Sequence, residues 1–426
     1  MADIRPFCAW RFSEKAGPIE ELTCPPYDII SEQQRQAYLA RNPYNIIRLE
    51  LPRDGEDPYA TAGKTWQSWK TDGILQRDAQ AGFYIYDISF TVEGKDYTVG
   101  GLVARTHLEE FSKGIVLPHE FTLSKAKEDR LNLMKATNSN FSHIYSLYRD
   151  DSGRVEEYLA QTRRQSAPLV EMTDGDGLQH RLWALTDPDI VDAISRHLAD
   201  TKLYIADGHH RYETALNYRD YCRAQGAKPG CGVDYVMMML VEMSHPGLVV
   251  FPTHRLVRDV PGFDGERITK ACKAYFHVEE GVPVEGMKQR LDEAYKAGQK
   301  AFGWYTGGDT AVLLVLKDPK SMDEFLPDVS PVSRQLDVNV LHTLILERLM
   351  GIDKENMANQ KNLIYTRDMN EAVEEVRSGR CQGCFVMNPT RVQEIRDVAA
   401  AGEKMPQKST YFYPKLITGL TMNSLD

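Results

Sequence analysis

The chain has 426 residues, of which 42% are hydrophobic and 26% charged, a balance typical of a folded globular protein. This length exceeds one ordinary hydrophobic core and favours two domains. The formal net charge of −10 argues against nucleic acid as the main partner, because the phosphate backbone would be repelled.

The N-terminal stretch MADIRPFCAWRF lacks the apolar run of a signal peptide. No window approaches the roughly 18 apolar residues that a membrane helix requires. Seven cysteines, an odd number scattered along the chain, fit a reducing compartment. We therefore expect a cytoplasmic protein with no membrane partner.

The first half of the chain is predicted to be rich in β-strands. Residues 82–107 predict a hairpin, because two strand-like runs flank a Glu-Gly-Lys turn. Further strands are expected at 143–148 and within 168–185. Asp187 and Pro188 then predict the start of a helix, which apolar residues continue at four-residue spacing.

That helix leads into a strand at 203–206, a tight turn and a second helix from residue 210. The apolar run at 233–243 has the length of a strand buried on both faces, although a buried helix has the same pattern. A strand-like segment ending in PTHR follows. A lone His-Arg pair, here His254 and Arg255, is more often a surface ion-pairing site.

Beyond residue 256 helical and strand-like segments alternate, which predicts an α/β region. We predict a sheet-rich domain at 1–255 and an α/β domain with a C-terminal arm at 256–426. The fold class is therefore mixed α/β, of the α+β kind. The segment MPQKSTYFYPKL at 405–416 is expected to wrap back as that arm or as a strand.

The stretch YIADGHHRYE at 204–213 places polar residues directly after an apolar strand. A turn between a strand and a helix offers backbone N–H groups and the positive end of the helix dipole, which attract anions. Gly208 permits close approach, and His209, His210 and Arg211 add side-chain donors. Asp207 would repel a phosphate, so it is explained by a bridging metal ion, a proton-transfer role or simple capping of the helix.

Residues 116–142 hold a second polar cluster, which includes the sequence LPHE. Phosphoryl transfer needs a carboxylate that accepts a proton and cations that neutralise the moving group. Glu120 is the candidate base, and the candidate cations are Lys125, Lys127 and Arg130. A solvated helix face remains the favoured explanation for Glu128 and Asp129.

A third group lies near the start of the chain. The prolines of TCPPYDII and NPYNIIRLELP force extended or turn backbone. Tyr27, Asp28, Tyr44 and Arg48 therefore become candidates for a rigid pocket wall. Ordinary half-buried packing of the tyrosines is an equally good explanation.

The chain resembles the domain-of-unknown-function 1015 family of bacteria and archaea in motifs that span nearly its whole length: CPPYDII, NPYNIIRLELP, HEFTLSKAKEDRLNLMKATNSNFSHIYSLY, ADGHHRYETAL and MPQKSTYFYPKL. Its Asp-Gly-His-His-Arg turn also resembles the phosphate-binding turn of the ParB and sulfiredoxin superfamily, which includes free serine kinases. In those kinases a matching turn holds the nucleotide phosphates, and a Glu from a PHE-like segment serves the serine hydroxyl. The resemblance implies a ParB/sulfiredoxin-like, sheet-rich nucleotide-binding region.

The residues and the resemblance together predict phosphoryl transfer, with a nucleotide-dependent free serine kinase linked to serine metabolism as the leading hypothesis. Two alternatives stay open: a phosphoserine phosphatase, and a non-catalytic regulator that binds a nucleotide or a phosphorylated metabolite. The implied cofactors are Mg²⁺ and a nucleotide (ATP, ADP or CTP), and the implied substrate is serine or phosphoserine.

The predicted site residues fall into three roles. Catalytic roles are assigned to Glu120, Asp207 and His209, and Asp207 is also the predicted metal ligand. Nucleotide binding is assigned to Gly208, His210, Arg211, Lys125, Lys127 and Arg130.

Overall fold

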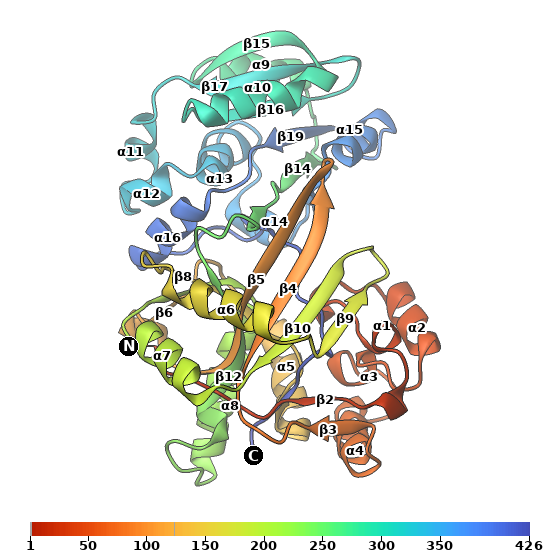
Figure 1. Ribbon diagram of the computed structural model, residues 1–426. Coiled ribbons are helices and arrows are strands. Elements are labelled where there is room, and N and C mark those ends of the chain that lie inside the picture. The colour runs from red at the N-terminus through yellow and green to blue at the C-terminus, as the bar shows by residue number, and fades with distance from the viewer. Residues whose placement is uncertain (1, 123) are drawn as a thin grey trace. The chain divides into compact units, whose positions relative to one another are not determined.

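The hairpin predicted at residues 82–107 lies at the centre of the first sheet. In the computed structural model, which describes residues 2–122 and 124–426 but not the side chains of residues 124–126 and 358, β4 (Phe83–Val92) pairs antiparallel with β5 (Lys95–His107). The chain divides into two compact units (Figure 1): Met1–Pro118, Thr122–Val249 and Pro414–Asp426 form the first, and His119–Phe121 and Val250–Tyr413 form the second. The predicted mixed α/β class is confirmed.

The first unit is built on a mixed sheet in the order β6-β11-β8-β12-β5-β4-β10-β9, with β1 also paired to β5. Outside this sheet, β2 pairs with β3 and β7 pairs with β21. The strands of the first unit are β1 (Ile4–Arg5), β2 (Trp10–Phe12), β3 (Leu75–Arg77), β4, β5, β6 (Val116–Leu117), β7 (Ser139–Asn140), β8 (Ile144–Tyr148), β9 (Val170–Thr173), β10 (Gln179–Leu185), β11 (Leu203–Asp207), β12 (Tyr235–Glu242) and β21 (Asn423–Ser424).

The helices of this unit are α1 (Ile19–Leu22), α2 (Glu32–Arg41), α3 (Ile47–Glu50), α4 (Pro58–Thr71), α5 (Ser124–Thr137), α6 (Arg154–Gln165), α7 (Pro188–Leu198) and α8 (His209–Ala224), with short 3₁₀ turns η1 (Glu14–Ala16), η2 (Tyr27–Ile29), η3 (Phe111–Lys113) and η4 (Gly232–Asp234). Helix α7 begins where predicted, because Asp187 accepts hydrogen bonds from the backbone N–H groups of Asp189 and Ile190.

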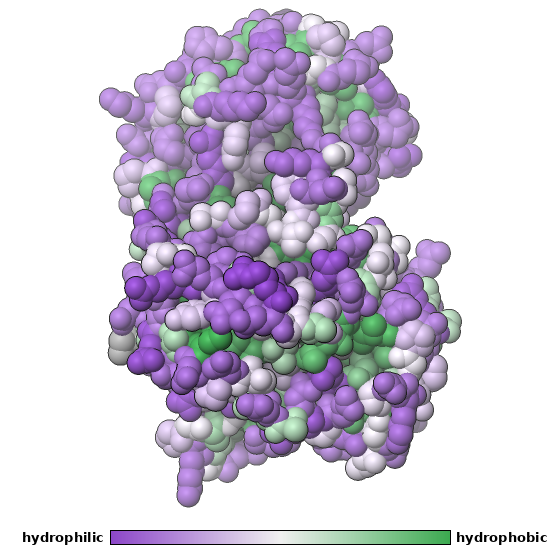
Figure 2. All heavy atoms as spheres, viewed as in Figure 1, coloured by the Kyte–Doolittle hydropathy of each residue, from purple (hydrophilic) through white to green (hydrophobic). Residues whose placement is uncertain are grey.

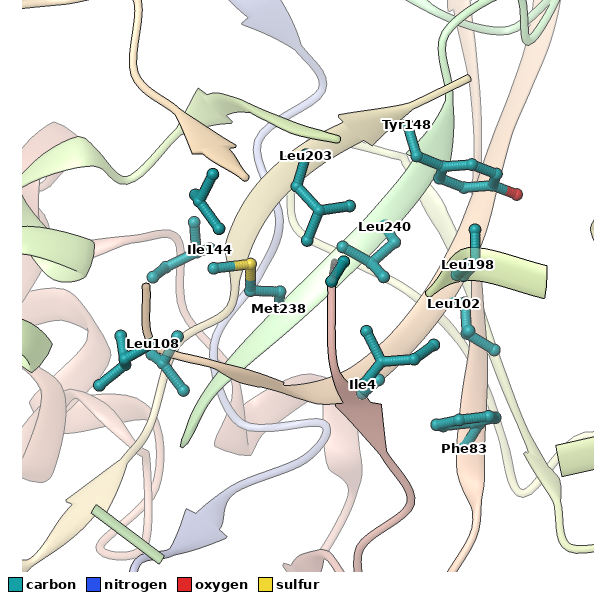
Figure 3. Close-up of a cluster of buried hydrophobic side chains, with 14 of the residues drawn as sticks. Ile4, Phe83, Leu102, Leu108, Ile144, Tyr148, Leu198, Leu203, Met238 and Leu240 are labelled. Atoms are coloured by element: carbon teal, nitrogen blue, oxygen red, sulfur yellow. The ribbon is translucent and has the colours of Figure 1, made fainter. Parts of the chain in front are cut away.

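The main core of the first unit lies where the sheet meets its covering helices. Figure 3 shows side chains from β1, β4, β5, β8, β11 and β12 gathered with Leu198 of α7. The run predicted as a buried strand is β12, in which Met238 and Leu240 are fully buried. A second cluster, which includes Trp66 and Trp69 of α4, joins the N-terminal helices to Leu133 of α5.

The second unit contains an antiparallel sheet in the order β15-β17-β16-β19-β14-β18. Strand β13 (Val249–Val250) lies where the chain passes into this unit. The remaining elements are β14 (His254–Val257), α9 (Gly265–Cys272), β15 (Phe276–Pro283), α10 (Val284–Lys296), β16 (Ala301–Tyr305), β17 (Thr310–Leu316), α11 (Ser321–Phe325), α12 (Pro331–Arg334), α13 (Asp337–Val340), the π-helix η5 (Leu341–Glu347), α14 (Lys354–Ala358), β18 (Leu363–Thr366), α15 (Met369–Arg377), β19 (Gly383–Met387), α16 (Val392–Ala400) and β20 (Phe412–Tyr413).

The face shown in Figure 2 is mostly hydrophilic. Large hydrophobic side chains that remain exposed include Phe121, Leu169, Tyr221 and Val332. Across residues 2–122 and 124–426, no helix has both the length and the hydrophobicity needed to span a bilayer.

The close approach of β12 to Gly101 in β5 can be tested by substitution of this glycine. A Cβ atom at Gly101 would lie 2.5 Å from the carbonyl oxygen of Leu240 in β12. Gly101→Ala should therefore lower the free energy of unfolding by roughly 2 kcal/mol, measured by denaturant titration. Gly286→Ala in α10 is the matched control: no heavy atom lies within 4 Å of its added Cβ, so a gain of about 0.5–1 kcal/mol is expected. Equal effects at both positions would contradict this account of the sheet.

Candidate functional site

The strand, turn and helix predicted at residues 204–213 are present in the first unit. Strand β11 ends at Asp207, and α8 begins at His209. Gly208 between them has φ 94°, in the left-handed region that favours glycine. A Cβ atom at Gly208 would also lie 3.0 Å from Nε of Arg211. The 16-residue helix α8 directs the positive end of its dipole at this turn, which suits an anion.

The carboxylate of Asp207 holds two cations. Arg211 Nη2 donates to its Oδ2 at 2.6 Å, and Lys415 Nζ donates to its Oδ1. Burial raises the pKa of Asp207, but the charges of Lys415 and Arg211 more than offset this and hold the pKa well below its usual range. The helix-capping explanation does not apply, because Gly208 occupies the N-cap position and no side chain caps α8 there.

Arg211 joins the turn to the interior of the first unit. Its Nη1 donates to the carbonyl oxygen of His143, just before β8. Its Nε has no hydrogen-bond partner, and the same holds for Oε1 of Glu50. Both residues line a cavity of about 40 Å³, a size that accommodates a water molecule.

Glu50 and Arg130 continue this polar cluster away from the turn. Arg130 Nη1 donates to the carbonyl oxygen of Glu50 at 2.6 Å and lies 3.9 Å from its Oε1. Burial raises the pKa of Glu50, although the charges of Arg130 and Arg211 partly offset the rise. The guanidinium of Arg130 also lies over the ring of Tyr27, 4.0 Å from its centroid. The electrostatic influence of Asp28 and Tyr27 reaches Arg211 as well.

Two of the three predicted cations of α5, Lys127 and Arg130, have described side chains, and these lie in different environments. Lys127 donates to Glu213 Oε2 at 2.7 Å, and Thr122 donates to the same oxygen at 2.7 Å. Arg130 is buried and also donates to the carboxylate of Asp129. The side chain of Lys125 lies outside the described residues. The roles of all three in nucleotide binding stay predictions.

Glu120 and the two histidines of the turn belong to different units. Glu120 lies in the second unit, where its Oε1 accepts a hydrogen bond from the backbone N–H of Lys408 at 2.9 Å. His209 is 4% exposed, whereas His210 is half-buried. Both begin α8 in the first unit.

The group near the N-terminus separates into two pairs. Tyr27 and Asp28 lie in η2, near Arg130 and Arg211. Tyr44 instead packs edge-on against Trp69, with ring centroids 5.8 Å apart, and Arg48 donates to the carbonyl oxygen of Leu39. Only the first pair reaches the polar cluster, so packing accounts for the second.

The expectation of a surface ion pair at His254 and Arg255 is wrong. His254 is 3% exposed and Arg255 is 2% exposed, and β14 lies between β19 and β18 in its sheet. Packing on the faces of the sheet therefore buries two residues that the short motif would place at the surface.

Sequence reasoning missed Glu50 and Lys415 as members of the site. A single glutamate inside the apolar run NIIRLEL was a local signal for Glu50, because a buried carboxylate needs partners. Lys415 had no such signal, since 208 positions separate it from Asp207.

The predicted metal role of Asp207 stays a prediction. Its two oxygens are engaged by Lys415 and Arg211. Within the part of the chain that the structure describes, no three His, Cys, Asp or Glu side chains are grouped to hold a metal ion. A metal would therefore need most of its ligands from a bound molecule.

Removing the Asp207 carboxylate should destabilise the first unit in a pH-dependent manner. Asp207→Asn leaves two cations without a partner, so we expect a loss of roughly 3 kcal/mol in the free energy of unfolding at neutral pH. Because the folded-state pKa is depressed, this contribution is complete above the ordinary value of 3.8 and is lost as the pH falls toward the folded-state pKa. Chemical denaturation from neutral pH down to about pH 2 measures the difference.

The control variant is Asp151→Asn, because the Asp151 side chain is 74% exposed. This variant should have the same free energy of unfolding as the wild type at every pH. A difference between wild type and Asp207→Asn that stayed constant over the whole pH range would contradict the assignment.

Comparisons with solved structures give distant similarities. A free serine kinase in complex with AMP has 14% identity over 75% of this chain and 90% of that chain, with a TM-score of 0.35. SbnI from Staphylococcus aureus with a C-terminal truncation has 11% identity over 75% of this chain and 87% of that chain, with a TM-score of 0.36. A conserved hypothetical protein from Pyrococcus furiosus has 14% identity over 73% of this chain and 94% of that chain, with a TM-score of 0.33. Because all three TM-scores are below 0.5, no function is assigned to this chain from these similarities.

No curated protein matches the sequence. The family model described as protein of unknown function, DUF1015, matches residues 4–339. The match covers well over half of the chain, and the protein therefore belongs to the DUF1015 family.

Proposed function

We propose that this protein is a nucleotide-dependent kinase that phosphorylates the hydroxyl group of a small metabolite, with free serine as the leading substrate. The turn at Gly208 carries the proposal: a left-handed glycine joins β11 to the N-terminus of α8, with Arg211 and Lys415 beside it. Helix dipole, backbone N–H groups and cations together suit the phosphates of ATP, ADP or CTP.

The charges around Arg211 support a role for Mg²⁺. Arg211 lies within the influence of three carboxylates, Asp28, Glu50 and Asp207. Two further cations share these carboxylates, because Arg130 acts on Glu50 and Lys415 pairs with Asp207. Because this set is close to neutral, nucleotide phosphates would bring uncompensated negative charge. Mg²⁺ bound with the nucleotide would neutralise that charge, and Asp207 would be its protein ligand by exchanging a cationic partner.

Glu120 is the proposed general base. In the transfer, the bond between the terminal phosphorus and its bridging oxygen breaks, and a new bond forms from that phosphorus to the serine hydroxyl oxygen. The hydroxyl proton passes to the Glu120 carboxylate, which the Lys408 N–H orients. His209 and His210 donate hydrogen bonds to the phosphates, and Lys125, Lys127 and Arg130 add positive charge.

The proposed activity is tested with purified protein, L-serine, Mg²⁺ and each of ATP, ADP and CTP, with phosphoserine quantified by mass spectrometry. Glu120→Gln should keep the nucleotide affinity and lower turnover by about 10²–10⁴-fold, because only the proton acceptor is lost. Gly208→Ala should lower the nucleotide affinity at least about tenfold, since the left-handed turn becomes strained. Glu128→Gln, an exposed position of α5, is the control and should leave both quantities unchanged.

The other two hypotheses correspond to distinct outcomes. Release of phosphate from phosphoserine, without phosphoserine formation from serine, would replace the kinase by a phosphatase. Nucleotide binding without either reaction would leave a non-catalytic regulator. Loss of turnover in Glu128→Gln equal to that in Glu120→Gln would contradict the assignment of the base.

A further inference from the structure

Arg255 is a buried cation without a counter-ion. It is 2% exposed in the second unit, where its guanidinium donates to the carbonyl oxygens of Thr253 and, at 3.1 Å, Lys408. Among the described residues no carboxylate lies within ion-pair distance of it. Arg35, which is 1% exposed, is different: its Nη2 lies 2.8 Å from Asp54 Oδ2. A buried charge ordinarily needs such a partner, so Arg255 is the exception to explain.

His342 is a second buried group with an unsatisfied nitrogen in the second unit, and it lies within the electrostatic influence of Arg255. It is 6% exposed and lies in the π-helix η5, a type of helix frequent at functional sites. Neither His342 Nε2 nor Arg255 Nε has a hydrogen-bond partner. Burial and the charge of Arg255 hold the pKa of His342 well below its usual range. Leaving two buried polar nitrogens unpaired is costly, and a ligand that accepted hydrogen bonds from both would remove the cost.

The turn that covers Arg255 also holds Glu120. Lys408 has φ 59°, a strained value for a residue other than glycine. Its N–H donates to Glu120, and its carbonyl oxygen accepts from Arg255. Lys408 is itself exposed, so the residue whose carbonyl oxygen accepts from Arg255 also reaches the surface. Glu120 is also close enough to raise the pKa of Arg255, which burial lowers to about 10.

We infer that Arg255 and His342 bind the carboxylate of the small-molecule substrate, near Glu120 in the second unit. A carboxylate is planar and accepts two hydrogen bonds in one plane, which matches a guanidinium. Its single negative charge balances the single buried cation, whereas a phosphate dianion would exceed it. The inference rests on the proposed function for the substrate hydroxyl, and it narrows the substrate to a hydroxy acid or a hydroxylated amino acid.

Two matched pairs of probes test the carboxylate directly: L-serine against serinol, and D-glycerate against glycerol. Each alcohol lacks the carboxylate of its partner. Calorimetry on the full chain, with and without AMP, should show that at least one acid binds at least about tenfold more tightly than its alcohol, since a charge-assisted pair is lost. Equal affinities within both pairs, or no acid binding under either condition, would overturn the inference.

Three variants identify the residues. Arg255→Met should abolish the preference for the acid and keep the AMP affinity, and Arg255→Lys, which keeps the charge but loses the planar fork, should fall between Arg255→Met and wild type. His342→Phe should weaken acid binding several-fold. Arg334→Met in the same unit, a partly exposed arginine paired with Asp323, should change nothing. Thermal unfolding verifies that each variant is folded.

The outcomes separate this inference from the proposed function. A folded Arg255→Met or Arg255→Lys protein with the acid affinity of wild type would overturn the inference, even if phosphoserine is formed. Acid binding that depends on Arg255, in a protein that makes no phosphoserine, would support the inference while the proposed kinase activity fails.

Discussion

The ion pairs of Asp207 with Arg211 and Lys415 are the interaction on which the site of the first unit depends. Arg211 comes from the first turn of α8, whereas Lys415 comes from the last segment of the chain, so one carboxylate fixes two distant parts of the sequence. Its depressed pKa keeps it charged across the neutral range. The turn is thereby ordered before any ligand binds, which lowers the cost of reorganisation on binding.

The C-terminal segment reaches this carboxylate because the first unit anchors it at several other points. Strand β21 pairs with β7, and His143 Nε2 lies 2.7 Å from Thr421 Oγ1. The carbonyl oxygen of the same His143 accepts from Arg211. Residues 414–426 are therefore part of the structure that holds the turn, and the packing of the residues that follow Lys415 helps to position it.

The sequence was informative wherever a feature depends on residues close together in the chain. The Asp187 cap, the hairpin at β4 and β5 and the tight turn between β11 and α8 are all set by neighbours within a few positions, so patterns predicted them. Lys415 reaches Asp207 only through tertiary packing, and no local pattern reports that. The burial of Arg255 was missed for a related reason: tertiary packing decides what covers the faces of a sheet, and the short sequence PTHR does not report it.

Arg211 and Arg255 show two solutions to the burial of a guanidinium. Arg211 has Asp207 as its direct partner and lies within the influence of Asp28 and Glu50. Arg255 instead donates to carbonyl oxygens and lies over the ring of Tyr365, and among the described residues it has no carboxylate as a direct partner. Carbonyl dipoles solvate a guanidinium without cancelling its charge. A ligand at the first arginine therefore has to compete with carboxylates already present or bring its own cation, as a nucleotide with Mg²⁺ does. A ligand at the second gains the full attraction of a desolvated cation for a single anion, which is why we assign the carboxylate there and the phosphates to the turn.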